Sequence, residues 1–171
     1  MNKIIYPACF FTATNLSWKP LLASENHKQI IMNSLLFLKN DKRVIVYAFV
    51  IMANHIHLIW QPTGVHTPKQ NQHNFLKFTA QMIKFHLLKN NLILLKDYRV
   101  NASDREYQFW ERNPLSIELY SEKVFIQKLN YLHKNPVKAG LCTYPEDYIY
   151  SSALFYETGK DAWGILTHYK G

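Results

Sequence analysis

The sequence predicts an α+β fold, a ferredoxin-like antiparallel sheet with helices packed on one face. Strand-like and helix-like segments follow one another in the order strand, helix, strand, strand, helix, strand. The second and third strands are separated only by a short turn, so they are expected to pair. The 171 residues show no repeat and no Gly/Ser linker. We therefore expect one domain over 1–171, with 141–171 forming a C-terminal aromatic extension packed on it.

The first half of the chain supplies the sheet and one helix. Residues 6–16 are aromatic and β-prone and predict the first strand. Ser24 is expected to cap a helix over 24–41, in which Ile31, Leu35 and Leu38 recur at helical spacing. The continuous apolar run 43–53 predicts a central strand, and residues 53–62 predict its partner after a turn near Asn54.

The second half is predicted to be more helical. Residues 67–91 form a helix with Pro68 in its first turn and one apolar stripe made of Phe75, Phe78, Met82 and Phe85. The stretch up to Asp104 is expected to be a loop, and 106–114 and 117–120 to be extended, with Trp110 in the core. Ser121 is expected to cap a third helix over 121–135, which Pro136 ends.

Composition restricts the class of protein. Twenty Lys and Arg against 12 Asp and Glu give a net charge of +8, which favours a polyanionic partner such as nucleic acid over an anionic membrane surface. Cys9 and Cys142 are expected to be reduced thiols. The N-terminal stretch 1–11 lacks the form of a signal peptide, and the longest apolar run is about half of a membrane span. We expect a cytoplasmic protein with no membrane association.

The motif His55-Ile-His57 is the first candidate for chemistry. On a strand, side chains at i and i+2 share a face and lie roughly 6.6–6.8 Å apart, so both imidazoles can point at one metal ion. The alternative is a pair of surface or hydrogen-bonded core histidines. No HExxH motif, third alternating histidine or adjacent carboxylate accompanies the pair. Any further ligand must come from elsewhere in the chain.

The third predicted helix offers such groups. At 100° per residue, Lys128, Tyr131 and Asn135 share one face, beside an apolar stripe of Phe125, Leu129 and Leu132 that would dock the helix on the sheet. The tyrosine is equally explained as a residue at the edge of the core, and the asparagine before a proline as a helix terminator. From these residues alone both interpretations stay open.

Three segments together resemble the REP-associated tyrosine transposases, which belong to the single-tyrosine HUH transposases. They are "MANHIHLIWQP", "KLNYLHKNPVKAGL" and "PEDYIYSSA", and the resemblance spans most of the chain, with 98–114 matching less clearly. It implies a ferredoxin-like fold and cleavage of single-stranded DNA beside a hairpin, with a 5′-phosphotyrosine intermediate. By this resemblance His55, His57 and Asn135 are ligands of Mg²⁺ or Mn²⁺, and Tyr131 is the nucleophile.

The residue types suit that chemistry. A divalent ion can polarise a phosphodiester, and a neutral phenol needs nearby positive charge or a proton acceptor to become a good nucleophile. Lys128, one turn before the tyrosine, could supply that charge or contact phosphate, although a solvated helix lysine explains it equally well. Candidate DNA contacts on other segments are Lys77, Lys84 and Arg112, with Lys69, Lys89 and Arg105, and again a solvated polar face is the alternative.

These observations lead to one main hypothesis and two alternatives. The main hypothesis is a transposase that nicks and rejoins single-stranded DNA next to a hairpin, acting as a monomer or a homodimer. The first alternative is a non-catalytic module of the same fold that binds hairpin DNA. The second is a metal-dependent hydrolase of small phosphoesters, which would use water in place of Tyr131.

Overall fold

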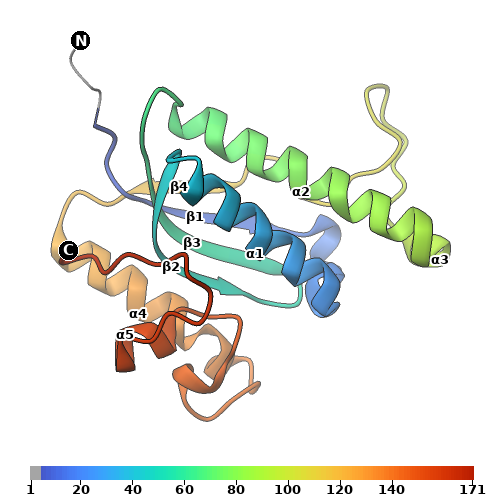
Figure 1. The fold of residues 1–171 in the computed structure, drawn as a ribbon. Coiled ribbons are helices and arrows are strands. Elements are labelled where there is room, and N and C mark those ends of the chain that lie inside the picture. Colours follow the sequence, from blue (N-terminus) through green and yellow to red (C-terminus); the bar gives the residue numbers. More distant parts are fainter. Residues whose placement is uncertain (1–4) are drawn as a thin grey trace.

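The computed structural model describes residues 5–171, and in this part of the chain the centre is a four-stranded antiparallel sheet (Figure 1). Residues 1–4, which belong to the predicted domain and to the stretch predicted to lack a signal peptide, lie outside the described residues. The strands are β1 (Cys9–Thr14), β2 (Val44–Ile51), β3 (His55–Pro62) and β4 (Leu115–Glu118), in the order β2-β3-β1-β4. This is the ferredoxin-like order. The predicted α+β class and antiparallel sheet are therefore confirmed.

Two helices cover one face of the sheet. They are α1 (Glu25–Asn40) and α2 (Pro68–Asn90), and both contribute to the core formed with Phe11, Leu58 and Trp60. Thr67 and Gln70 form a capping box at the start of α2, with Pro68 in the first turn as predicted. A short helix, α3 (Leu92–Lys96), follows where the sequence predicted a loop.

The apolar stripe predicted for α2 is wrong in part. Phe75 is buried, but Phe78, Met82 and Phe85 are exposed. The buried face of α2 is instead made of Asn71, Phe75, Thr79, Ile83 and Leu87. Two small polar side chains lie on this inner face, and Thr79 satisfies its hydroxyl by donating to the Phe75 carbonyl at 2.9 Å. The distribution of apolar and polar residues in the sequence therefore indicated the wrong face of α2 as the buried one.

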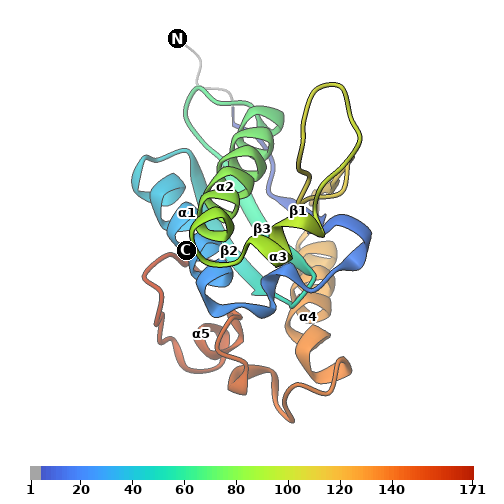
Figure 2. The same cartoon turned by 90° about the vertical axis from the view of Figure 1, so that its right-hand side faces the viewer.

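The helix α4 (Glu122–Lys138) lies on the opposite face, which departs from the expectation that the helices share one face (Figure 2). That expectation holds for α1 and α2. The predicted stripe of Phe125, Leu129 and Leu132 does dock α4 on the sheet, but against the face that carries Phe10 and Ile59. Because β2 and β3 are buried on both faces, each side of the sheet needs its own cover.

Pro136 does not end α4, contrary to the prediction. The helix continues to Lys138 and is closed by Gly140, whose φ of +70° is left-handed, and by the Leu141 N–H donating to the Pro136 carbonyl. A proline removes its own N–H and crowds the carbonyl four residues earlier, and within one turn of its end α4 accommodates both. Pro136 is also buried, so its ring contributes to packing.

The segment after Gly140 packs along the outer edge of β2. It contains a 3₁₀ turn (Pro145–Asp147) and α5 (Ala153–Thr158). The Ile51 N–H donates to the Tyr150 carbonyl, the Ser152 N–H to the Phe49 carbonyl, and the Thr167 N–H to the Val46 carbonyl. Aromatic side chains of the same segment join the core on both faces, among them Tyr150, Tyr156 and Tyr169.

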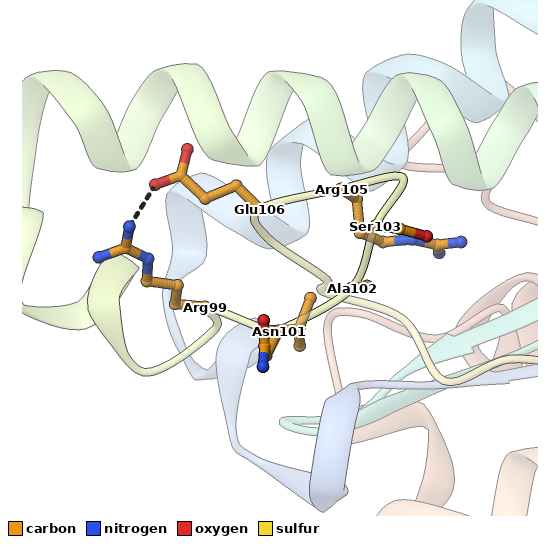
Figure 3. A pocket seen from close by; sticks show the side chains of 7 residues that line it. Arg99, Asn101, Ala102, Ser103, Arg105 and Glu106 are labelled. Carbon is orange, nitrogen blue, oxygen red and sulfur yellow. Dashed lines mark ion pairs between the residues drawn. The ribbon is translucent and has the colours of Figure 1, made fainter.

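Between α3 and β4 the chain runs in extended form, with a projecting loop over residues 99–106 (Figure 3). The Arg99 guanidinium and the Glu106 carboxylate pair across its base at 3.3 Å. The hollow beside the loop has a volume of about 750 Å³ and is wide open and polar. None of the helices in residues 5–171 combines the length and the hydropathy needed to cross a bilayer.

Candidate active site

The two histidines of β3 point to the face covered by α4. His55 and His57 lie opposite Thr14 and Thr12 in the ladder between β1 and β3. Their ring centroids are 4.8 Å apart. His57 is almost fully buried, with 5% of its surface exposed, and its ring stacks on Phe10 at 5.2 Å. The strand geometry predicted from the sequence therefore brings the two imidazoles together.

The neighbours of His55 fix its tautomer. Its Nδ1 lies 2.7 Å from the Asn54 Oδ1, and the Asn54 Nδ2 donates to the Trp18 carbonyl at 3.3 Å. Because the amide nitrogen is used by that carbonyl, the amide oxygen faces the imidazole and accepts from Nδ1–H. The proton of His55 therefore resides on Nδ1, and Nε2 keeps a free lone pair.

His57 is held in a comparable way. Its Nδ1 lies 2.7 Å from the Thr12 Oγ1, so a hydroxyl of the neighbouring strand anchors the ring. Burial lowers the pKa of His57 to about 3, and the positive charges of His55 and Lys128 act in the same direction. Burial also lowers the pKa of His55, opposed by its contact with Asn135. Near neutral pH both rings are uncharged, which is the form that can bind a metal.

The helix α4 brings the other two candidate residues to the histidines. The Tyr131 ring lies 5.4 Å from the His57 ring and is 44% exposed, so its phenol is accessible from solvent. One turn later the Asn135 Nδ2 donates to the Tyr131 carbonyl at 3.2 Å. This bond turns the Asn135 Oδ1 toward His55, whose Nε2 is 3.4 Å away.

Two hydrogen-bond acceptors therefore face each other. The Nε2 of His55 and the Oδ1 of Asn135 both present lone pairs, because the donors of both groups are used elsewhere. A cation between them removes this mismatch, and nitrogen from imidazole with oxygen from an amide is a donor set that Mn²⁺ and Mg²⁺ accept. Within residues 5–171 no cluster of three or more His, Cys, Asp or Glu could hold a metal. A site here depends on the asparagine.

Two lysines surround the tyrosine. The Lys128 Nζ lies 5.8 Å from the centre of the Tyr131 ring and 4.9 Å from that of Phe10. The Lys138 Nζ, two turns after the tyrosine, lies 5.5 Å from the same ring. The structure thus places Lys128 beside the phenol, as its helical spacing suggested. Two ammonium groups at this point favour the binding of a phosphate.

The remaining candidate DNA contacts lie elsewhere. Lys77, Lys84 and Arg112 line a groove of about 1380 Å³ between α2 and residues 104–118, and none of the four candidate site residues lines this groove. Carboxylates also line this groove, namely those of Asp104, Glu106, Glu111 and Glu118. Its charge is therefore mixed. Trp110 is 6% exposed and donates from Nε1 to the Thr79 Oγ1, so it is a core residue, as expected.

Several residues around the site were not found from the sequence. Thr12 and Asn54 orient the imidazoles, Phe10 supports His57, and Trp18 contacts His55 with ring centroids 6.0 Å apart. No sequence signal marks Thr12, because its partner is set by the register between strands 45 residues apart. Lys138 was missed because the helix was predicted to end at Pro136, whereas in α4 it follows Tyr131 by seven residues and so shares its helix face.

Comparison with known proteins supports the fold. No family model and no curated protein matches the chain. The solved structure of a REP-associated tyrosine transposase bound to a REP hairpin is 18% identical and superposes with a TM-score of 0.66, covering 95% of this chain and 87% of that one. A proposed transposase from Deinococcus radiodurans R1 is 12% identical over 78% of this chain and 92% of its own, with a TM-score of 0.48, which is too low to bear on function.

Proposed function

We propose that this protein cleaves and rejoins single-stranded DNA next to a hairpin, in the manner of the REP-associated tyrosine transposase whose fold it shares. The observation that carries the proposal is the meeting of His55, His57, Tyr131 and Asn135, which come from β3 and from a helix more than seventy residues later. A module that only bound DNA would have no use for an exposed phenol beside two oriented imidazoles.

The two imidazole Nε2 atoms and the Asn135 Oδ1 would hold Mg²⁺ or Mn²⁺. When bound, such an ion polarises the scissile phosphate and helps to orient the 3′ leaving oxygen. Asn54 keeps His55 in the tautomer that binds metal, and the Thr12 hydroxyl anchors the His57 ring at Nδ1, as partners on the second ring nitrogen commonly do. Imidazole favours Mn²⁺ in affinity, whereas oxygen ligands and cellular abundance favour Mg²⁺.

Tyr131 would be the nucleophile. Its oxygen attacks the phosphorus, the bond from phosphorus to the 3′ oxygen breaks, and that oxygen leaves as a hydroxyl after taking up a proton. The phenol proton passes to solvent, and the product is a 5′-phosphotyrosyl ester. Because the ester keeps the energy of the phosphodiester, a 3′ hydroxyl can reverse the reaction. Lys128 and Lys138 lie where the phenolate and the phosphate carry negative charge.

The proposed substrate and assembly follow from the same features. A net charge of +8 suits DNA, and the related structure is bound to a REP hairpin. Because all four residues of the site come from one chain, a monomer suffices for the proposed reaction, although a homodimer is compatible with it. We place Lys77, Lys84 and Arg112 among the contacts to the hairpin arm, and we place the protein in the cytoplasm, where its DNA would be.

The decisive experiment looks for a covalent complex. The protein is incubated with a pool of labelled stem–loop oligonucleotides with randomised stems and single-stranded flanks, in Mn²⁺ or Mg²⁺, and is then denatured on a gel. We expect a protein-linked labelled band that requires the metal. Tyr131→Phe should abolish this band and leave hairpin binding intact, because the change removes only the hydroxyl. Tyr144→Phe, an exposed tyrosine beyond α4, is the matched control and should keep the band.

The other outcomes identify the alternatives. Binding without cleavage by the wild-type protein would mean a hairpin-binding module. Cleavage without a linked band, unchanged in Tyr131→Phe, would mean a hydrolase that uses water. An adduct that persists in Tyr131→Phe would show that another residue is the nucleophile.

A further inference from the structure

Two consecutive residues beside the site adopt a backbone conformation that side chains rarely accept. Ser17 has φ +54° and ψ +31°, and Trp18 has φ +56°, both in the left-handed region. For a bulky residue such as tryptophan this conformation is strained, and such strain persists only where surrounding contacts impose it. Residues of this kind gather at functional sites.

Two segments that are distant in the sequence impose the turn. The Ser17 N–H donates to the Glu111 carboxylate at 2.6 Å, and the Leu16 N–H donates to the Phe109 carbonyl at 2.9 Å. From the other side, the Asn54 Nδ2 donates to the Trp18 carbonyl at 3.3 Å. Asn54 is the residue that also orients His55. The position of the turn is therefore coupled to that of the candidate metal ligand.

The turn presents its tryptophan to solvent. Trp18 is 63% exposed, whereas Trp60 and Trp110 are buried in the core with 1% and 6% exposed. Its indole meets the His55 ring edge to face, with centroids 6.0 Å apart and an interplanar angle of 66°. Because the Trp18 side chain is mostly exposed, burial of its apolar surface does not explain why the strained backbone is maintained. A large aromatic face is instead kept open at the rim of the candidate active site.

We propose that Trp18 is a stacking platform for an unpaired base of the nucleotide next to the scissile phosphate. The inference rests on the proposed function, since it assumes that a single strand passes His55. A phosphate held at the imidazoles leaves its neighbouring base within reach of the indole. Stacking on an aromatic ring fixes a flexible strand without reading its sequence. Glu111 acts as a positioning residue, because its carboxylate holds Ser17 and thereby the angle of the indole.

The platform predicts a specific kind of binding. An aromatic face recognises bases and not phosphates, so it should distinguish oligothymidylate from a chain of abasic deoxyribose phosphates of the same length and charge. Base stacking on one aromatic side chain is worth about ten-fold to a hundred-fold in affinity. Loss of the indole should remove this preference and leave binding of the abasic chain unchanged.

The experiment measures fluorescence quenching and affinity with these two probes. The wild-type protein is titrated with oligothymidylate and with the abasic chain, and compared with Trp18→Ala, Trp18→Phe and the control Phe37→Ala, an exposed aromatic on α1. We expect oligothymidylate to quench the wild type and to bind about ten-fold or more tightly than the abasic chain. Trp18→Ala should lose both the quench and the preference, and Trp18→Phe should recover much of the preference. Phe37→Ala should behave as the wild type.

Failure of this inference is separable from failure of the proposed function. If Trp18→Ala keeps the preference for bases, or if the wild type shows none, the platform is refuted, whatever the adduct assay shows. If the preference depends on Trp18 but no covalent adduct ever forms, the platform stands and the cleavage proposal fails. Glu111→Ala should weaken the preference and Glu111→Gln should restore it, because the amide oxygen can accept from Ser17 in place of the carboxylate.

Discussion

His133 links the helix of the candidate nucleophile to the sheet, and its titration should control acid stability. It lies on α4 two residues after Tyr131 and is 8% exposed. Its Nε2 lies 2.8 Å from the Ser152 Oγ, which also accepts from the Phe49 N–H at 3.0 Å in β2. Burial lowers the pKa of His133 from 6.5 to about 4. Among residues 5–171 no carboxylate forms an ion pair with His133.

The size of the effect follows from linkage. The unfolded chain takes up this proton near 6.5 and the folded chain only near 4, so the stability present above pH 6.5 is lost as the pH falls toward 4. The complete loss is about 3 kcal/mol, and at about pH 5 the loss is about 2 kcal/mol relative to pH 8. These losses are substantial compared with the free energy of unfolding of a typical domain, which is about 5–15 kcal/mol.

The variant His133→Gln tests this assignment, because glutamine does not titrate. Urea unfolding of both proteins is measured in a chelating buffer at about pH 8 and at about pH 5. The glutamine lowers stability at both pH values by a similar amount, so the informative quantity is the change between them. We expect the wild type to lose about 2 kcal/mol more than the variant. Equal losses in the two proteins would refute the assignment of acid sensitivity to His133, because every other titrating group is shared.

Three further outcomes follow from the site and its supporting helix. Thr12→Val removes the partner of the His57 Nδ1 and should weaken Mn²⁺ binding about ten- to a hundred-fold by calorimetry, with an unchanged fold; equal affinity would contradict the anchoring role. Leu129→Ala should cost about 2–4 kcal/mol in urea unfolding, because this side chain lies on the buried face of α4 and is 6% exposed; a change within the error would mean that α4 is loosely docked. Lys128→Met keeps most of the side-chain volume but removes the charge, and should slow adduct formation about ten-fold at saturating DNA; an unchanged rate would assign the lysine to solvent.

The sequence predicted the parts of the fold that depend on local pattern. Each predicted strand of the sheet and each of the three long helices is present, because amphipathic periodicity and start signals such as Pro68 and Ser121 act over a few residues. The shared face of His55 and His57 is likewise a local property of a strand. The side of the sheet on which a helix lies is not local. For α4 it is decided by the apolar face left open by α1 and α2.

The candidate site shows the same division. The helical spacing of Lys128, Tyr131 and Asn135 placed them on one face, and the structure brings that face to the histidines. Their catalytic and metal-binding roles stay predictions. Asn54 was predicted only as a turn residue and Thr12 was not predicted at all. Their contacts with the imidazoles depend on the register between strands and on the carbonyl of the distant Trp18. Trp18 was missed because a strained backbone has no signature in sequence.

The C-terminal segment along β2 has a consequence for the behaviour of shortened chains. With Tyr150, Ser152 and Thr167 in place, the peptide groups on the outer side of this long apolar strand are already matched. The strand at the opposite edge of the sheet, β4, is only four residues long. It therefore has few free peptide groups with which another strand could pair. A protein truncated before residue 141 would expose β2 as a template for strand addition from another molecule. Such a fragment should polymerise through its sheets more readily than the full chain.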